Sequence, residues 1–154
     1  MRKLNRTGRY SRIYKQLRDL FMAGHDLQSR MATVNALLYH KMDGFFWVGF
    51  YLLQDGHLVV GPYQGPLACL ELERDKGVCW AGINRNESIV VPDVHAFPGH
   101  IACDSRSKSE IVIPLRDPEG RILGVLDIDS DRPACFDETD ARRLEEMVRL
   151  LTAG

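Results

Sequence analysis

The chain has 154 residues, with 20 lysine and arginine side chains, 21 aspartate and glutamate side chains and four cysteines. This length fits one domain, and 45% hydrophobic with 27% charged residues is ordinary for a soluble globular protein. The composition excludes a disordered chain, a collagen and a coiled coil, and the formal charge of -1 argues against a dedicated nucleic-acid binder, which needs a basic surface.

The chain begins with two predicted helices, over about 10–22 and 27–42, with Gly24 ending the first and Asp26 capping the second. Apolar residues of the first helix fall on one face: Ile13, Leu17, Leu20 and Phe21. Residues 1–24 carry seven basic side chains and one acid, as mitochondrial presequences do, but the apolar stripe favours a solvated basic helix face. Neither a secretory signal nor an apolar stretch of roughly 20 residues is present, so we expect a cytoplasmic protein with reduced thiols.

Residues 45–53 are rich in aromatic and β-branched side chains and predict a strand. An Asp-Gly pair follows, which is a strong hairpin signal, so residues 58–63 are expected to pair antiparallel with that strand. The next part is less regular, with a short helix over 77–86, a short strand over 88–91 and a long connection over 93–107. Long loops inside compact domains are commonly functional, and this one holds two histidines and a cysteine.

Regular structure resumes with a second predicted hairpin, in which strands over 109–116 and 122–130 flank an Asp-Pro-Glu-Gly turn. A last helix is expected from the N-cap Asp137, with acids in its first turn. The order of elements predicts an α+β fold, a central antiparallel sheet covered by helices. We expect a single domain over 1–154, with N-terminal helices over about 10–42, sheet and active-site loops over about 45–130 and a C-terminal helix over about 137–152.

Three acids are predicted to meet on one face of the second hairpin. Asp127 and Asp129 are two residues apart on a strand and therefore point to the same side. Glu110, near the end of the partner strand, is able to approach both. Three carboxylates repel one another unless a cation or a shared proton intervenes. The face is therefore either a solvated sheet surface or a cavity for an ammonium group, a metal ion or a protonated ligand.

The long connection holds the most reactive candidate, Cys103, which follows His95 and His100 and precedes Asp104. A thiolate near imidazolium or backbone amides has a lowered pKa and is a competent nucleophile. The alternative is a buried thiol that acts as a small hydrophobic group. The spacing His-x4-His-x2-Cys matches no common zinc pattern, so we expect no metal site.

The other cysteines suggest redox chemistry. A thiolate that attacks an electrophilic oxygen donor becomes a sulfenic acid, which a second thiol converts to a disulfide. Cys69 and Cys79 lie on a nearby stretch and are candidates for that second thiol, whereas Cys135 is most simply a bystander. The motifs of nucleotide enzymes and classical hydrolases are missing, which argues against both classes.

Several stretches of the chain resemble the free methionine-(R)-sulfoxide reductases, which are single GAF domains. The resemblance covers about residues 14 to 150, and the run from Val91 to Ser105 is its most specific part. The matching segments are Trp47-Val-Gly-Phe-Tyr51, Gly61-Pro-Tyr-Gln-Gly-Pro-Leu-Ala-Cys69, Val91-Pro-Asp-Val-His-Ala-Phe-Pro-Gly-His-Ile-Ala-Cys-Asp-Ser105, Ser109-Glu-Ile-Val-Ile-Pro114 and Gly124-Val-Leu-Asp-Ile-Asp-Ser130. The chain departs from the family pattern at Trp80, where the family usually has glycine, and at Phe46, where it often has asparagine.

The resemblance implies redox roles for three cysteines. Cys103 is the expected nucleophile that attacks the sulfoxide sulfur, Cys69 the main resolving cysteine and Cys79 an auxiliary one. The resulting disulfide is expected to be reduced by thioredoxin, with no metal ion or cofactor. The resemblance also implies a homodimer.

The resemblance further implies how the substrate, free L-methionine-(R)-sulfoxide, is bound. Glu110 and Asp129 are expected at the sulfoxide oxygen, because crowded acids have raised pKa values and can supply the proton that the oxygen needs to leave. The other expected contacts are Trp47 and Tyr51 for the S-methyl end, Asp127 for the ammonium group, and the backbone around Ile101, Ala102 and Cys103 for the carboxylate. The alternative function is a GAF ligand-binding module or thiol redox sensor without turnover, which needs no nucleophile with a resolving partner.

Overall fold

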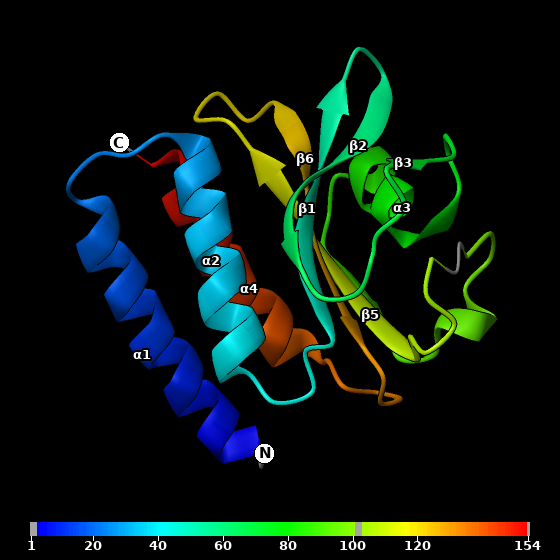
Figure 1. Cartoon of the computed structure of the whole chain (residues 1–154), viewed down its shortest axis with the longest axis horizontal. Coiled ribbons are helices and arrows are strands. Elements are labelled where there is room, and N and C mark those ends of the chain that lie inside the picture. The colour runs from blue at the N-terminus through cyan, green and yellow to red at the C-terminus, as the bar shows by residue number, and fades with distance from the viewer. Residues whose placement is uncertain (1–2, 101–102, 154) are drawn as a thin grey trace.

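The protein, described by a computed structural model over residues 3–100 and 103–153, is built around one six-stranded antiparallel sheet (Figure 1). The strands lie in the order β3-β2-β1-β6-β5-β4. Their bounds are β1 Trp47–Gln54, β2 His57–Gln64, β3 Glu71–Leu72, β4 Ile89–Val91, β5 Ser109–Arg116 and β6 Ile122–Ser130. The predicted α+β fold is confirmed, and both predicted hairpins are present as β1-β2 and β5-β6.

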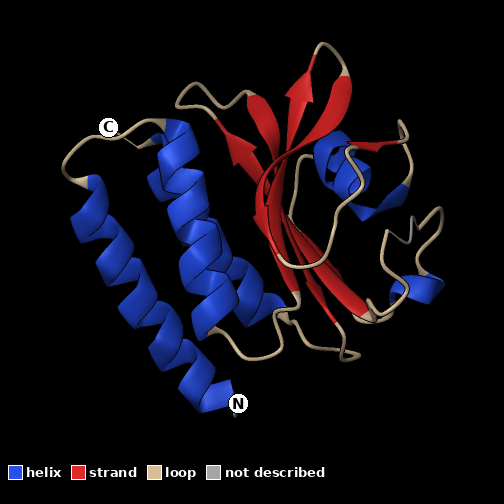
Figure 2. Cartoon of the chain, viewed as in Figure 1, coloured by secondary structure: helices blue, strands red, loops and turns tan. Residues whose placement is uncertain are grey.

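Helices cover the two faces of the sheet unequally (Figure 2). Three helices lie on one face and the short helix α3 lies on the other, beside the loops that contain Cys69 and Cys103. The helices are α1 Lys3–Phe21, α2 Leu27–Lys41, α3 Gly77–Arg85 and α4 Glu138–Thr152. No helix in the described part of the chain is both long and apolar enough to cross a membrane.

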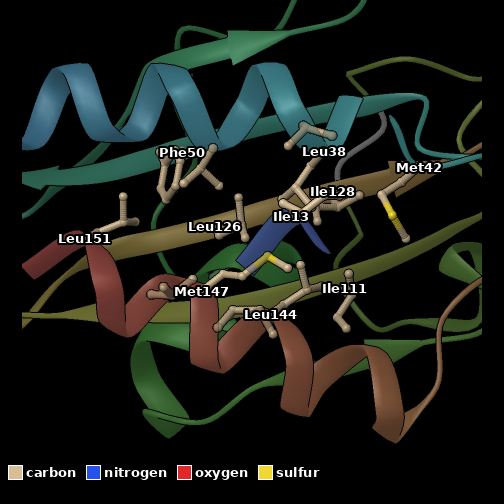
Figure 3. Close-up of a cluster of buried hydrophobic side chains, with 14 of the residues drawn as sticks. Ile13, Leu38, Met42, Phe50, Ile111, Leu126, Ile128, Leu144, Met147 and Leu151 are labelled. Carbon is tan, nitrogen blue, oxygen red and sulfur yellow. The ribbon is translucent and has the colours of Figure 1, made fainter. Parts of the chain in front are cut away.

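The apolar core under the three helices uses one side of strands β1, β4, β5 and β6 (Figure 3). Residues Leu126 and Ile128 of β6 point into this core and are fully buried. Alternation along the strand therefore sends their neighbours Asp127 and Asp129 to the opposite face. The buried side chains labelled in Figure 3 are Ile13, Leu38, Met42, Phe50, Ile111, Leu126, Ile128, Leu144, Met147 and Leu151.

Local sequence signals explain the turns and caps that fix this fold. Asp26 accepts a hydrogen bond from the Ser29 backbone, and Asp137 forms a capping box at the start of α4. Asp55 and Gly56 have φ values of 52° and 82°, the left-handed conformations that a tight two-residue hairpin turn requires.

The structure corrects five details of the predicted elements. α1 begins at Lys3 rather than about residue 10. The ion pair of Arg6 with Asp140 of α4 stabilises the added turns. Leu20 does not belong to the buried face and is 47% exposed. The first strand starts at Trp47, two residues later than predicted, although the Phe46 backbone still donates to the Asp129 carbonyl at 2.8 Å. Strand β3 and a 3-10 turn at Val94–Ala96 were not predicted.

Candidate active site

A pocket opens on the α3 face of the sheet and gathers most of the predicted site residues. It lies between β1, β5 and β6 of the sheet, helix α3 and the connection that carries Cys103. The predicted residues that line it are Trp47, Tyr51, Cys79, Cys103, Glu110, Asp127 and Asp129. Cys69 joins the set through its bond to Cys103. The remaining two, Ile101 and Ala102, lie outside the described residues.

Strand register brings the three acids together. Asp129 is paired with Glu110 of β5 on one side and with Trp47 of β1 on the other. Asp127 lies two residues before Asp129, on the same face of β6. Glu110 and Asp127 are only 6% and 5% exposed, so this part of the sheet is a cavity wall and not a solvated surface.

The three acids differ in how strongly they hold a proton. Burial raises the pKa of Glu110 well above its ordinary value, and the charges of Asp127 and Asp129 raise it further. Burial likewise raises the pKa of Asp129 strongly, with Asp127 as the next cause. The pKa of Asp127 is raised less, since hydrogen bonds from Glu110 and Cys79 oppose the effect of burial. Burial and the neighbouring charges thus favour the protonated forms of Glu110 and Asp129.

Asp127 also has an oxygen that is free to bind a ligand. Its Oδ1 atom is buried and has no hydrogen-bond partner among the described residues. A buried carboxylate oxygen without a partner is costly in a folded protein. An N–H donor that enters the pocket would satisfy it.

Two cysteines are joined by a disulfide beside these acids. Cys69, in the connection between β2 and β3, is bonded to Cys103, 34 residues away, with Cα atoms 5.6 Å apart. Cys79 and Cys135 are free. The Sγ atom of Cys135 lies 3.5 Å from the Arg6 guanidinium, among residues of the helix-side core and away from the pocket.

Aromatic side chains of β1 form the apolar wall of the pocket and hold the Cys69 loop. The Trp47 ring stacks on Tyr51 at 5.8 Å and on Tyr63 at 5.2 Å between ring centres. Trp47 Nε1 donates to the Pro66 carbonyl at 3.1 Å, and the Tyr51 hydroxyl donates to the Cys69 carbonyl at 3.0 Å. The same two aromatic rings therefore shape the cavity and position the resolving-cysteine candidate.

The pocket includes residues that the sequence did not single out as site residues. Lys76 and Phe46 line it, and the Arg106 guanidinium lies 4.7 Å above the Phe46 ring. His100 also lines it, and burial lowers the pKa of its imidazole. Lys76, His100 and Arg106 come from loops, in which no periodic pattern reports the direction of a side chain, whereas Phe46 falls within the strand predicted over 45–53.

One group of described residues also has the spacing of a metal site. Ligand atoms of Cys79, Glu110 and Asp127 lie within 4.8 Å of one another, and all three residues are buried. A metal ion would first have to displace the protons that Cys79 and Glu110 hold, since burial raises the pKa of both. The sequence predicts no metal here, and in this group the free Oδ1 atom of Asp127 is suited to accept from a cationic N–H donor.

Comparison with known proteins places the chain in a family. Residues 25–153 match the family model of the GAF domain. The chain is 43% identical to GAF domain-containing protein A of Dictyostelium discoideum, covering 92% of this chain and 89% of that protein. It is 40% identical to the free methionine-R-sulfoxide reductase of Escherichia coli, covering 96% and 89% respectively.

A solved structure agrees with these relatives. The X-ray structure of free methionine-R-sulfoxide reductase from Neisseria meningitidis, in complex with its substrate, superposes with a TM-score of 0.87 at 43% identity. The similarity covers 93% of this chain and 86% of that one. The chain therefore belongs to the GAF-domain family of free methionine-R-sulfoxide reductases.

Proposed function

We propose that the protein reduces free L-methionine-(R)-sulfoxide to L-methionine with a cysteine nucleophile. The observation that carries this proposal is the Cys69–Cys103 disulfide beside a pocket lined by three acids that differ in proton affinity. A pocket that offers both a carboxylate and proton-bearing acids suits a ligand with an ammonium group and a basic oxygen. The membership of the chain in the reductase family supports the same substrate.

The substrate would bind as a zwitterion with its two ends on different walls. The free Oδ1 atom of Asp127 accepts a hydrogen bond from the ammonium group. Trp47 and Tyr51 surround the S-methyl end, where apolar contact replaces water. The substrate carboxylate is assigned to the backbone of Ile101, Ala102 and Cys103, of which the first two lie outside the described residues.

In the chemical step the Cys103 thiolate attacks the sulfoxide sulfur. Glu110 and Asp129, whose pKa values burial raises, donate protons to the sulfoxide oxygen, which leaves as water while a bond between the Cys103 sulfur and the methionine sulfur forms. A water molecule then attacks the Cys103 sulfur, the S–S bond breaks with its electron pair passing to methionine, and the departing methionine leaves Cys103 as a sulfenic acid. The Cys69 thiol then attacks this sulfenic acid, so that a disulfide and one water molecule are formed.

The disulfide must be reduced before another turnover. We assign this step to thioredoxin, whose two thiols supply two electrons and two protons and become a disulfide themselves. These two electrons and two protons are sufficient to reduce the disulfide, so no cofactor bound by this chain is needed. A homodimer remains an expectation from the family, and the proposed chemistry uses residues of one chain only.

The decisive experiment couples the purified protein to thioredoxin, thioredoxin reductase and NADPH. We expect NADPH consumption on adding free L-methionine-(R)-sulfoxide and none on adding the S epimer. Binding of methionine without turnover would contradict the proposal and favour a GAF ligand-binding or redox-sensing module.

Cysteine variants assign the two steps of the reaction. Cys103→Ser is expected to release no methionine. Cys69→Ser is expected to release one equivalent and then fail to recycle with thioredoxin, because the sulfenic acid has no resolving thiol. Equal methionine release by Cys103→Ser and the unmodified protein would remove Cys103 from its assigned role.

A further inference from the structure

Cys79 is a free thiol inside the proposed substrate pocket. It lies in α3, is 4% exposed and lines the cavity together with Glu110 and Asp127. Family resemblance suggests an auxiliary redox role, in which its sulfur would have to reach Cys103. In this structure Cys103 is bonded to Cys69, so Cys79 is not needed to complete the disulfide.

Helix α3 holds the Cys79 side chain firmly in place. The next residue, Trp80, is 4% exposed and its Nε1 atom donates to the Leu72 carbonyl at 3.3 Å. One turn further on, the backbone of Gly82 packs so closely on β5 that an added Cβ atom would lie 2.7 Å from Cγ1 of Val112. Movement of Cys79 out of the pocket would disrupt both contacts, whereas a fixed position suits a hydrogen-bond donor.

The polar groups next to the Cys79 thiol are carboxyl groups. Its Sγ atom and one oxygen each of Glu110 and Asp127 lie within 4.8 Å of one another. Burial raises the pKa of the thiol well above its ordinary value, and the charges of Asp127, Glu110 and Asp129 raise it further. Burial therefore favours the protonated thiol, which lies within 4.8 Å of a carboxylate oxygen of Asp127, and the Oδ1 atom of Asp127 has no hydrogen-bond partner among the described residues.

We propose that Cys79 is a positioning residue, whose thiol donates a hydrogen bond to Asp127 and so orients the free Oδ1 atom toward the substrate ammonium group. This inference rests on the proposed function, because it uses the amino group of that substrate. Cys79 then acts through Asp127 and changes no oxidation state during turnover. The role requires a donor at this position and does not require sulfur.

The test compares Cys79→Ser, which keeps a donor of similar size, with Cys79→Ala, which removes it. Loss of a hydrogen bond to a charged group weakens binding by roughly tenfold or more. We expect Cys79→Ala to raise KM for free methionine-(R)-sulfoxide by about this factor while kcat changes by less than about threefold. Cys79→Ser is expected to keep both KM and thioredoxin-dependent turnover within about threefold of the unmodified protein.

A second ligand separates positioning from simple damage to the pocket. The substrate analogue 4-(methylsulfinyl)butanoate lacks the amino group and so makes no contact with Asp127. Binding of each compound to the unmodified, Ser and Ala proteins is measured by calorimetry, on protein whose thermal unfolding shows it to be folded. Cys79→Ala is expected to weaken binding of the amino-bearing ligand only, and Cys135→Ser, at the other free cysteine, is expected to change nothing.

Two results would overturn the inference. Equal loss of thioredoxin-dependent recycling in Cys79→Ser and Cys79→Ala would show that sulfur chemistry is required at this position. Equal weakening of both ligands by Cys79→Ala would show a packing effect. Failure of the unmodified protein to turn over would instead contradict the proposed reaction, while the binding comparison would still decide the role of Cys79.

Discussion

Glu110 and Asp129 face each other across β5 and β6 and form, with Asp127, a group of carboxyls that is unfavourable for the fold. Their folded-state pKa values are raised, so between the ordinary carboxyl range and the raised values the folded state binds more protons than the unfolded state. The free energy of unfolding contributed by these groups is therefore highest at low pH and falls as the pH rises. The same raised pKa values keep proton donors available near neutral pH, where an ordinary carboxyl is ionised.

Replacement of Asp129 by asparagine separates the destabilisation that this buried acid causes from its proposed role as a proton donor. Because Asp129→Asn removes a buried acid, we expect Tm to rise at neutral and alkaline pH and to depend less on pH. We also expect kcat for methionine-(R)-sulfoxide to fall on the order of 100-fold, since an amide cannot give up a proton as a general acid. Thermal unfolding from pH 5 to 9, together with single-turnover release of methionine, checks both effects.

The exposed Asp19→Asn on α1 serves as the control for this pair of effects, since its side chain is 58% exposed and α1 lies on the face of the sheet opposite α3. It should leave both the pH dependence of Tm and kcat unchanged. An Asp129→Asn protein that retains full kcat would assign the proton donation to other groups.

At the scale of elements, periodic and capped segments were predictable from the sequence, and short irregular ones were not. The β5-β6 hairpin follows from alternation, an Asp-Pro-Glu-Gly turn and β-branched residues, and α4 follows from its cap at Asp137. β3 has only two residues, Glu71 and Leu72, and forms because β2 is there to pair with it. Such a strand has no local signal, since its stability comes from a partner distant in sequence.

The same distinction applies to the candidate site. Period-two alternation was enough to predict that Asp127 and Asp129 share a face, because strand geometry is regular. The pairing of Cys69 with Cys103 came only from family resemblance, since both lie in loops whose path no pattern specifies. Lys76 was missed for the same reason, as it precedes α3 in an irregular segment.

One buried carboxylate joins the first and last helices. Asp140 of α4 accepts hydrogen bonds from the Tyr10 hydroxyl at 2.7 Å and from Arg6 at 3.2 Å, and its Oδ2 atom accepts from the Asp137 backbone at 2.9 Å. We expect Asp140→Ala to lower the free energy of unfolding by about 3 kcal/mol, because it leaves Tyr10 and Arg6 without their buried partner. Urea unfolding followed by circular dichroism measures the change.

The exposed pair Arg143–Glu146 on the same helix provides the matched control. Its atoms lie 3.6 Å apart and the two side chains are 33% and 40% exposed, so Glu146→Ala should change stability little. Similar losses from Asp140→Ala and Glu146→Ala would mean that the charge of α4, and not the buried contact, holds the helices together.

Across the whole molecule, the two faces of the sheet have different tasks. The face under α1, α2 and α4 is covered by apolar side chains and supplies most of the buried core. The α3 face carries the pocket, the disulfide and the loops around them. Substitutions of the pocket acids can therefore change chemistry while the larger core keeps the protein folded.

Two exposed apolar side chains lie next to Cys69, one of the two cysteines of the disulfide. In the described part of the chain the strongly exposed large apolar residues are Leu20, Met22, Leu67 and Leu70. Leu67 and Leu70 flank Cys69, whereas the other two lie at the far end of α1. A protein that reduces the disulfide must approach Cys69 or Cys103, and apolar surface next to the bond would contribute to that contact.

Leu70→Ser tests this expectation without altering the pocket lining, because Leu70 is 74% exposed and is not among the residues that line the pocket. Burial of a leucine side chain is worth about 1.5–3 kcal/mol, so we expect KM for thioredoxin to rise roughly tenfold. Turnover driven by a small dithiol such as dithiothreitol should remain unchanged, since that reductant needs no protein surface. Met22→Ser removes an equally exposed apolar side chain far from the disulfide and should alter neither reaction. If Leu70→Ser and Met22→Ser behave alike with thioredoxin, the reductant reaches the disulfide without the leucines beside Cys69.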